Sequence, residues 1–135
     1  MILLDTSGLL AAYDRDDAFH RDVVENLSLD QRRILSPFVL AELDYLLATR
    51  AGQDVELQAL RDVASGAYEL VDLTGEDILR CIEIMERYGD LGLGLADASI
   101  VVLATRFDCP DILTLDQRHF RAVEAPRGQG FRLLP

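Results

Sequence analysis

Ile2-Leu3-Leu4-Asp5-Thr6-Ser7-Gly8 joins a short apolar run to an acid, two hydroxyl residues and a glycine. The run 2–4 predicts a buried strand, and the polar residues after it predict the start of a helix that continues through Tyr13. Asp5 would therefore stand at the carboxyl end of its strand. In parallel sheets, ligands bind outside the carboxyl ends of the strands.

The remaining sequence repeats this alternation of short apolar runs and helical patterns. Strands are predicted at 33–35, 68–73, 112–115 and 131–134, the last as an edge strand, and helices at 18–27, 38–50, 54–64, 76–88 and 95–107, with a short turn or helix at 118–122. This alternation predicts an α/β fold with a mainly parallel central sheet flanked by helices. At 135 residues, the chain is expected to form one domain over 1–135. Asp116 would directly follow the strand 112–115.

The charge composition excludes several kinds of chemistry. The net charge is −11, and all 13 basic residues are arginine. Without lysine, a P-loop nucleotide site and Schiff-base catalysis are excluded. An acidic chain should not bind nucleic acid through bulk electrostatics, so contact with nucleic acid would need bound cations or a local group of arginines.

Four acids occupy positions that a surface charge would not choose. Asp5 and Asp116 end predicted strands, and Glu42 and Asp97 lie among apolar neighbours on predicted helices. Buried carboxylates need partners, yet no arginine lies three or four residues from Glu42 or Asp97. Acidic clusters without basic partners are typical of sites for Mg²⁺ or Mn²⁺. We expect the four acids to converge on a shared cation.

Three of the four acids also have a structural interpretation. Asp5 would be a helix N-cap, Asp97 a first-turn acid that complements the helix dipole, and Asp116 a turn residue. Glu42 cannot be separated from Asp44 by helical periodicity. The conjunction of all four acids favours the metal site.

Four segments together resemble the acidic motifs of PIN domains, in matching order along the whole chain. These segments are Leu3-Leu4-Asp5-Thr6-Ser7, Ser36-Pro37 with Ala41-Glu42-Leu43, Leu95-Ala96-Asp97-Ala98-Ser99 and Leu113-Thr114-Leu115-Asp116. The chain is most similar to the VapC toxins of bacterial VapBC toxin–antitoxin modules. Asp116-Gln117-Arg118-His119-Phe120 is similar to a tail common in those toxins.

The resemblance implies a PIN-like fold and a Mg²⁺-dependent endoribonuclease, with Mn²⁺ as the other candidate ion. It implies Asp5, Glu42, Asp97 and Asp116 as catalytic and metal-binding acids, with Thr6 and Ser7 at a hydroxyl position that supports Asp5. It further implies a homodimer, inhibition by a cognate VapB-type antitoxin, and cleavage of structured RNA, either tRNA or large-subunit rRNA.

Two other classes of function remain open. One is a non-catalytic PIN-like interaction protein whose acidic cluster binds a basic partner peptide. The other is a metal-dependent phosphatase with Asp5 as nucleophile, which is disfavoured because the chain has no lysine and Ser7 replaces a second acid. No apolar run approaches the roughly 20 residues of a membrane helix, and no signal peptide is recognised, so a cytoplasmic location is expected.

Further residues have more than one interpretation. His119 is interpreted as a proton donor, an RNA contact or a turn residue. Arg118 and Arg121 are interpreted as phosphate-binding residues or as solvated surface residues. The helix 38–50 has more apolar residues than one core-facing stripe needs, and the helix 54–64 adds others. We expect part of this surface to bind an antitoxin segment or a second copy of the chain.

Overall fold

The computed structural model describes all residues from 1 to 135 and contains one five-stranded sheet with the order β3-β2-β1-β4-β5. Every pairing in this sheet is parallel. The strands are β1 Ile2–Leu4, β2 Arg33–Leu35, β3 Glu69–Leu70, β4 Asp111–Leu113 and β5 Arg132–Leu134. The α/β fold with a parallel sheet is therefore confirmed, and the last strand lies at an edge as expected.

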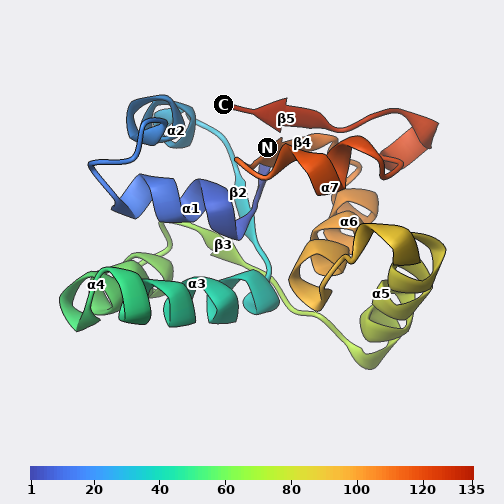
Figure 1. Cartoon of the computed structure of the whole chain (residues 1–135), viewed down its shortest axis with the longest axis horizontal. Coiled ribbons are helices and arrows are strands. Elements are labelled where there is room, and N and C mark those ends of the chain that lie inside the picture. Colours follow the sequence, from blue (N-terminus) through green and yellow to red (C-terminus); the bar gives the residue numbers. More distant parts are fainter.

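Helices cover the sheet on both sides. They are α1 Thr6–Tyr13, α2 His20–Ser28, α3 Pro37–Arg50, α4 Gln53–Ala64, α5 Gly75–Arg87, α6 Leu95–Phe107 and α7 Gln117–Arg121, with short 3-10 turns at Gly89–Leu91 and Pro126–Gly128. In Figure 1, α1 to α4 lie in the left half of the view, and α5 and α6 lie in the right half. None of these helices has the length and apolar character needed to cross a membrane.

The core is built from the apolar runs that predict the strands. Ile2, Leu3 and Leu4 are fully buried, as are Ile112 and Leu113 of the neighbouring β4. Burial on both faces is usual for parallel strands. The helix α6 runs beside β1, and seven consecutive residues from Ala98 to Ala104 are buried.

Three strands are shorter than their sequence pattern predicts, and among them β5 begins at Arg132 instead of at 131. β4 ends at Leu113 rather than Leu115. The Thr114 N–H still donates to the Leu134 carbonyl oxygen of β5 at 2.8 Å, and the chain leaves the sheet after it. The N–H of Leu115 donates to Ser7 Oγ at 2.9 Å, and the N–H of Asp116 donates to Thr114 Oγ1 at 3.1 Å. Asp116 therefore lies three residues beyond the strand instead of directly after it. The edge strand β3 spans only Glu69–Leu70 of the expected 68–73.

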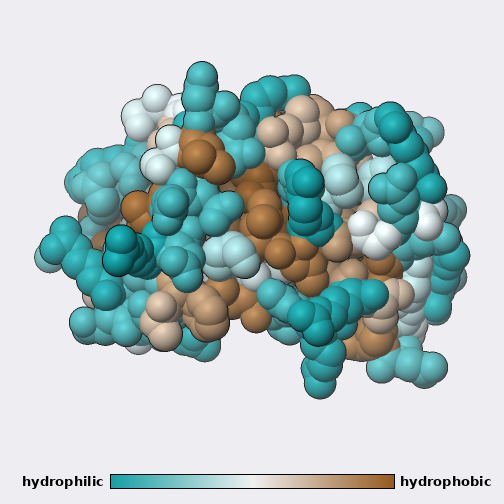
Figure 2. All heavy atoms as spheres, turned by 90° about the horizontal axis from the view of Figure 1, so that it is seen from above, coloured by the Kyte–Doolittle hydropathy of each residue, from teal (hydrophilic) through white to brown (hydrophobic).

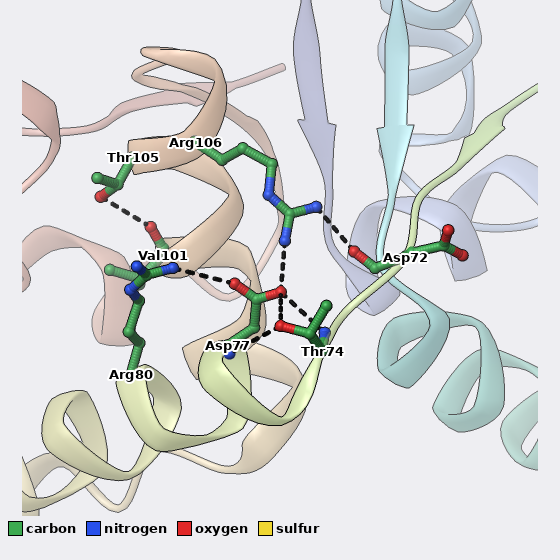
Figure 3. A network of polar contacts seen from close by, with 7 residues as sticks. All are labelled: Asp72, Thr74, Asp77, Arg80, Val101, Thr105 and Arg106. Carbon is green, nitrogen blue, oxygen red and sulfur yellow. Dashed lines mark hydrogen bonds and ion pairs between the residues drawn. The ribbon is translucent and has the colours of Figure 1, made fainter.

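A buried acid fixes α5 against α6 (Figure 3). Asp77 accepts hydrogen bonds from the Thr74 N–H at 2.8 Å and from Arg106 Nη2 at 2.6 Å, and Arg80 contacts its other oxygen at 3.3 Å. The Thr74 hydroxyl in turn accepts from the Asp77 N–H, which completes a capping box. Arg106 also donates to the Asp72 carbonyl oxygen at 2.7 Å. This network anchors α6, the helix whose first turn holds Asp97.

Candidate active site at the carboxyl edge of the sheet

Asp5 is the most buried of the four predicted site acids, with 5% of its surface exposed. It occupies the N-cap position of α1, but its side chain makes no capping hydrogen bond. Its Oδ2 instead accepts from Ser7 Oγ at 2.7 Å and from Thr114 Oγ1 at 2.7 Å. The interpretation of Asp5 as a simple helix cap is therefore wrong.

Burial and charge repulsion act on the Asp5 carboxyl in the same direction. Burial is the largest effect and raises its pKa, while hydrogen bonds from Ser7, Thr114 and the Thr6 backbone lower it; repulsion by Glu42 raises the pKa further. The net result is a raised pKa, because loss of water disfavours the ionised form. A nearby cation would reverse this effect.

Asp97 lies in the first turn of α6 and faces the same edge of the sheet. Burial raises the pKa of its carboxyl most strongly, and repulsion by Asp5 adds to this rise. Its Oδ2 also accepts from the Gly94 N–H at 3.3 Å. Asp97 therefore bonds to the start of its own helix, as its structural interpretation expects, and its charge is repelled by that of Asp5.

His119 joins Asp97 to Asp116. Its Nδ1 lies 3.5 Å from Asp97 Oδ2 and 3.7 Å from Asp116 Oδ2. The positive form of this imidazole would lower the pKa of Asp97. The three side chains come from α6, the segment after β4, and α7. His119 is thus placed among the site acids, and it is not a remote turn residue.

Glu42 and Asp116 are exposed, which corrects the expectation that all four acids occupy positions that a surface charge would not choose. On α3, the buried positions are Val39, Leu43 and Leu47, and Glu42 lies off this stripe. It nevertheless raises the pKa values of Asp5 and Asp97 by repulsion. The side chain of Asp116 is 54% exposed because it follows the point where the chain leaves the sheet. Only the carboxylates of Asp5 and Asp97 are therefore buried enough to need a charged or hydrogen-bonding partner.

Hydroxyl groups support the site differently from what the sequence suggests. Ser7 bonds to Asp5, but the buried Oγ1 of Thr6 has no hydrogen-bond partner. The second supporting hydroxyl belongs to Thr114, which sequence reasoning did not assign. A further buried pair, Ser36 Oγ and Ser99 Oγ at 2.7 Å, joins the start of α3 to the first half of α6. The sequence signal that could have identified Thr114 and Ser99 was a hydroxyl residue within an otherwise apolar segment.

The donor chemistry of this edge fits a hard divalent cation, since all four acids offer carboxylate oxygens. Two of them have raised pKa values, which a bound cation would relieve. The four acids lie along one edge, but no three acidic, histidine or cysteine side chains form a group that holds a metal ion. The expectation that they already converge on a shared cation is thus not met. Mg²⁺ commonly takes one or two carboxylates and several waters.

Comparison with known proteins identifies the family. Residues 2–126 match the PIN domain family. The chain is also 44% identical to Ribonuclease VapC26 of Mycobacterium tuberculosis (strain ATCC 25618 / H37Rv), over 99% of this chain and the whole of that protein. The chain belongs to the PIN-domain family. Its resemblance to the VapC ribonucleases of that family is confirmed over nearly its full length.

Solved structures show the same fold for this PIN domain. The crystal structure of M. tuberculosis VapC20, a sarcin–ricin loop cleaving toxin, has a TM-score of 0.81 at 21% identity and covers 88% of this chain and 92% of that one. A chain of Rickettsia felis VapBC2, bound to a promoter DNA fragment, has a TM-score of 0.70 at 19% identity and full coverage of both chains. A chain of DNA-bound VapBC from Salmonella typhimurium has a TM-score of 0.66 at 20% identity and covers 98% of this chain and 95% of that one.

Proposed function

We propose that this PIN domain is a Mg²⁺- or Mn²⁺-dependent endoribonuclease toxin in which Asp5, Glu42, Asp97 and Asp116 are the metal-binding and catalytic acids. The observation that carries the proposal is the Asp5 carboxylate. This carboxylate is buried at the carboxyl edge of the sheet, and two hydroxyl donors orient it. It lies near the charges of Asp97 and Glu42 and forms no ion pair with an arginine. The 44% identity of the chain to Ribonuclease VapC26 supports the same activity.

Each side chain has a defined task in this proposal. Ser7 and Thr114 hold Asp5 Oδ2 in place, which leaves its other oxygen for a cation or a water molecule. Asp97 and Asp116 flank His119, which holds or releases a proton between them. Glu42, from α3, binds the cation or its water shell. When bound, the divalent ion lowers the pKa of a water molecule and neutralises phosphate charge.

The proposal extends to the substrate and the partners, which the relatives support in part. The substrate is structured RNA, either tRNA or large-subunit rRNA, and VapC20 is named for cleaving the sarcin–ricin loop. The inhibitor is a cognate VapB-type antitoxin, because two structural neighbours are VapBC complexes. The protein acts as a cytoplasmic homodimer.

The test is RNA cleavage by the purified protein with Mg²⁺, with Mn²⁺ and with a chelator. Cleavage should require the cation and leave 5′-phosphate ends, because hydrolysis by water needs no 2′-hydroxyl. Asp5→Asn should abolish cleavage, whereas Asp54→Asn on the exposed start of α4 should not change it. If the wild type binds basic peptides tightly but cleaves no RNA with either ion, the chain is the non-catalytic interaction protein instead.

A further inference from the structure

A depression of about 630 Å³ lies beside the candidate active site. Its lining comes from the start of α2, from both sides of Asp116 and from the C-terminus: Phe19, Leu115, Gln117, Arg118, Arg121 and Pro135. Figure 2 views the face on which α2 and β5 lie and shows apolar side chains open to solvent between hydrophilic ones. None of the four site acids lines the depression, so it is a separate feature.

The depression is lined by two arginines that form no ion pair with a carboxylate. Six of the arginines form ion pairs with carboxylates: Arg32, Arg80, Arg87, Arg106, Arg127 and Arg132. Arg118 and Arg121 are not among them, and Arg121 donates instead to the neutral Oε1 of Gln117. In a chain with a net charge of −11, two such guanidinium groups on one depression favour an anionic ligand.

Phe19 adds an aromatic surface to this charge. It is 51% exposed although it is large and apolar. Its backbone is held in place, because its N–H donates to Asp17 Oδ1 at 2.7 Å and its carbonyl oxygen accepts from the Val23 N–H at 2.9 Å. An exposed aromatic ring beside arginines is the combination with which proteins bind single-stranded nucleic acid, by base stacking and phosphate contacts.

Hydrogen bonds fix the depression relative to Asp5. Ser7 Oγ accepts from the Leu115 N–H at 2.9 Å and donates to Asp5 Oδ2 at 2.7 Å. One hydroxyl therefore connects the wall of the depression to the buried acid. A ligand in the depression would lie at a constant distance from the carboxylate edge.

We propose that this depression binds one unpaired nucleotide that flanks the cleaved phosphodiester, with its base stacked on Phe19 and its phosphate bound by Arg118 and Arg121. This inference rests on the proposed endoribonuclease function. Because every base offers a stacking face, the site selects for an unpaired nucleotide and not for a particular base. It directs cleavage to single-stranded positions such as loops within structured RNA.

The test is binding of a fluorescent oligoadenylate without divalent cations, followed by anisotropy. The Asp5→Asn protein serves as the parent, so that no cleavage occurs. Adding Phe19→Ala should weaken binding about tenfold, and Phe19→Tyr should restore it, since alanine substitution removes one stacked base. Adding Arg118→Gln should weaken binding and reduce the slope of log K against log salt by about 0.7, the value for one single-strand phosphate contact.

Matched controls lie elsewhere on the surface. Leu29→Ala removes another exposed apolar side chain, and Arg87→Gln removes an exposed arginine that is paired with Glu124. Both should leave affinity unchanged. An abasic oligomer of the same length should bind the parent and its Phe19→Ala variant equally. Thermal melts of each variant confirm that the fold is retained.

The outcomes separate this inference from the proposed function. Equal oligoadenylate affinity of the parent and its Phe19→Ala variant overturns the nucleotide site, even if the wild type cleaves RNA. Loss of antitoxin binding in Phe19→Ala with unchanged RNA affinity also overturns it and assigns the depression to a protein partner. Conversely, Phe19-dependent binding in a protein that cleaves no RNA contradicts the nuclease proposal and leaves an RNA-binding site.

Discussion

Thr114 is the residue that links the end of β4 to the candidate site. Its hydroxyl donates to Asp5 Oδ2 and accepts from the Asp116 N–H. Thr114→Val removes a donor to the ionised form of Asp5, so the pKa of that carboxyl should rise further. The acidic limb of the pH profile for RNA cleavage should therefore move to higher pH, and the free energy of unfolding should fall by about 1–3 kcal/mol.

The control for this prediction is Thr105→Val on α6. The Thr105 hydroxyl bonds only to the carbonyl oxygen of Val101, one turn earlier in its own helix. This variant should leave the pH profile unchanged. An unchanged acidic limb in Thr114→Val as well would show that Thr114 does not control the ionisation of Asp5.

Asp97→Asn tests the repulsion between the site acids. Burial and Asp5 raise the pKa of Asp97 above its ordinary value of 3.8. A raised carboxyl pKa means that the folded state binds protons more readily, so stability falls as pH rises from near 3.8 through the folded pKa. At neutral pH without divalent cations, Asp97→Asn should melt no lower than wild type, and any advantage should disappear in acid.

Addition of Mg²⁺ or Mn²⁺ should raise the melting temperature of wild type more than that of Asp97→Asn, because a ligand stabilises the state that binds it. Both effects are measured by thermal melts with and without a chelator. A clear loss of stability in the chelated variant would mean that the bond to the Gly94 N–H is the main role of Asp97.

At the scale of elements, α1 crosses β4 at a glycine. A Cβ added to Gly8 would lie 2.7 Å from the Leu113 carbonyl oxygen, which already accepts from the Asp5 N–H. Gly8→Ala should therefore push α1 away from β4, lower the free energy of unfolding by about 1–3 kcal/mol, and reduce cleavage by moving Ser7. Gly75→Ala at the start of α5 meets nothing within 4 Å and should be neutral or stabilising in the same chemical denaturation experiment.

The contact between α5 and α6 depends on the charge of Asp77. The hydrogen bond from the Thr74 N–H holds the pKa of this carboxyl below its ordinary value, and Arg106 lowers it further. A lowered carboxyl pKa adds stability above the unfolded value of 3.8, and this stability is lost as pH falls through the folded pKa.

Asp77→Asn should therefore lower the free energy of unfolding by about 1–2 kcal/mol at neutral pH, the value of a lost helix cap. The difference from wild type should shrink in acid. Arg87→Gln, which removes the exposed pair with Glu124 and the contact of Arg87 with the Tyr88 ring, should cost less than about 1 kcal/mol. A difference between Asp77→Asn and wild type that does not change with pH would contradict the role assigned to the charge.

At the scale of the whole molecule, α3 and α4 leave apolar surface uncovered. Tyr45 is 67% exposed and Leu57 is 36% exposed, while the core takes Val39, Leu43 and Leu47 from α3. Tyr45→Ala should weaken antitoxin binding or dimerisation, because large exposed aromatic residues contribute strongly to interfaces. Calorimetry with the antitoxin and sedimentation of the free protein measure the two effects. If neither changes, this face has no part in either contact.

Local patterns alone predicted the α/β fold with its parallel sheet and the position of Asp5. Apolar runs of strand length alternate with helical periodicity, so the parallel sheet and the bounds of α6 agree with the sequence interpretation. Asp5 directly follows β1 because a charged residue ends a buried apolar run. These features depend on neighbouring residues, and therefore the sequence by itself determined them.

Only the tertiary structure decided how the site is supported and which acids are buried. Thr114 reaches Asp5 across 109 residues of sequence, while the nearer Thr6 turns its hydroxyl into the core without a partner. Glu42 lies on the solvent side of α3. The segment after β4 is fixed at the site because the Leu115 N–H donates to Ser7 Oγ. Each of these outcomes depends on contacts between distant segments, whose geometry no local pattern specifies.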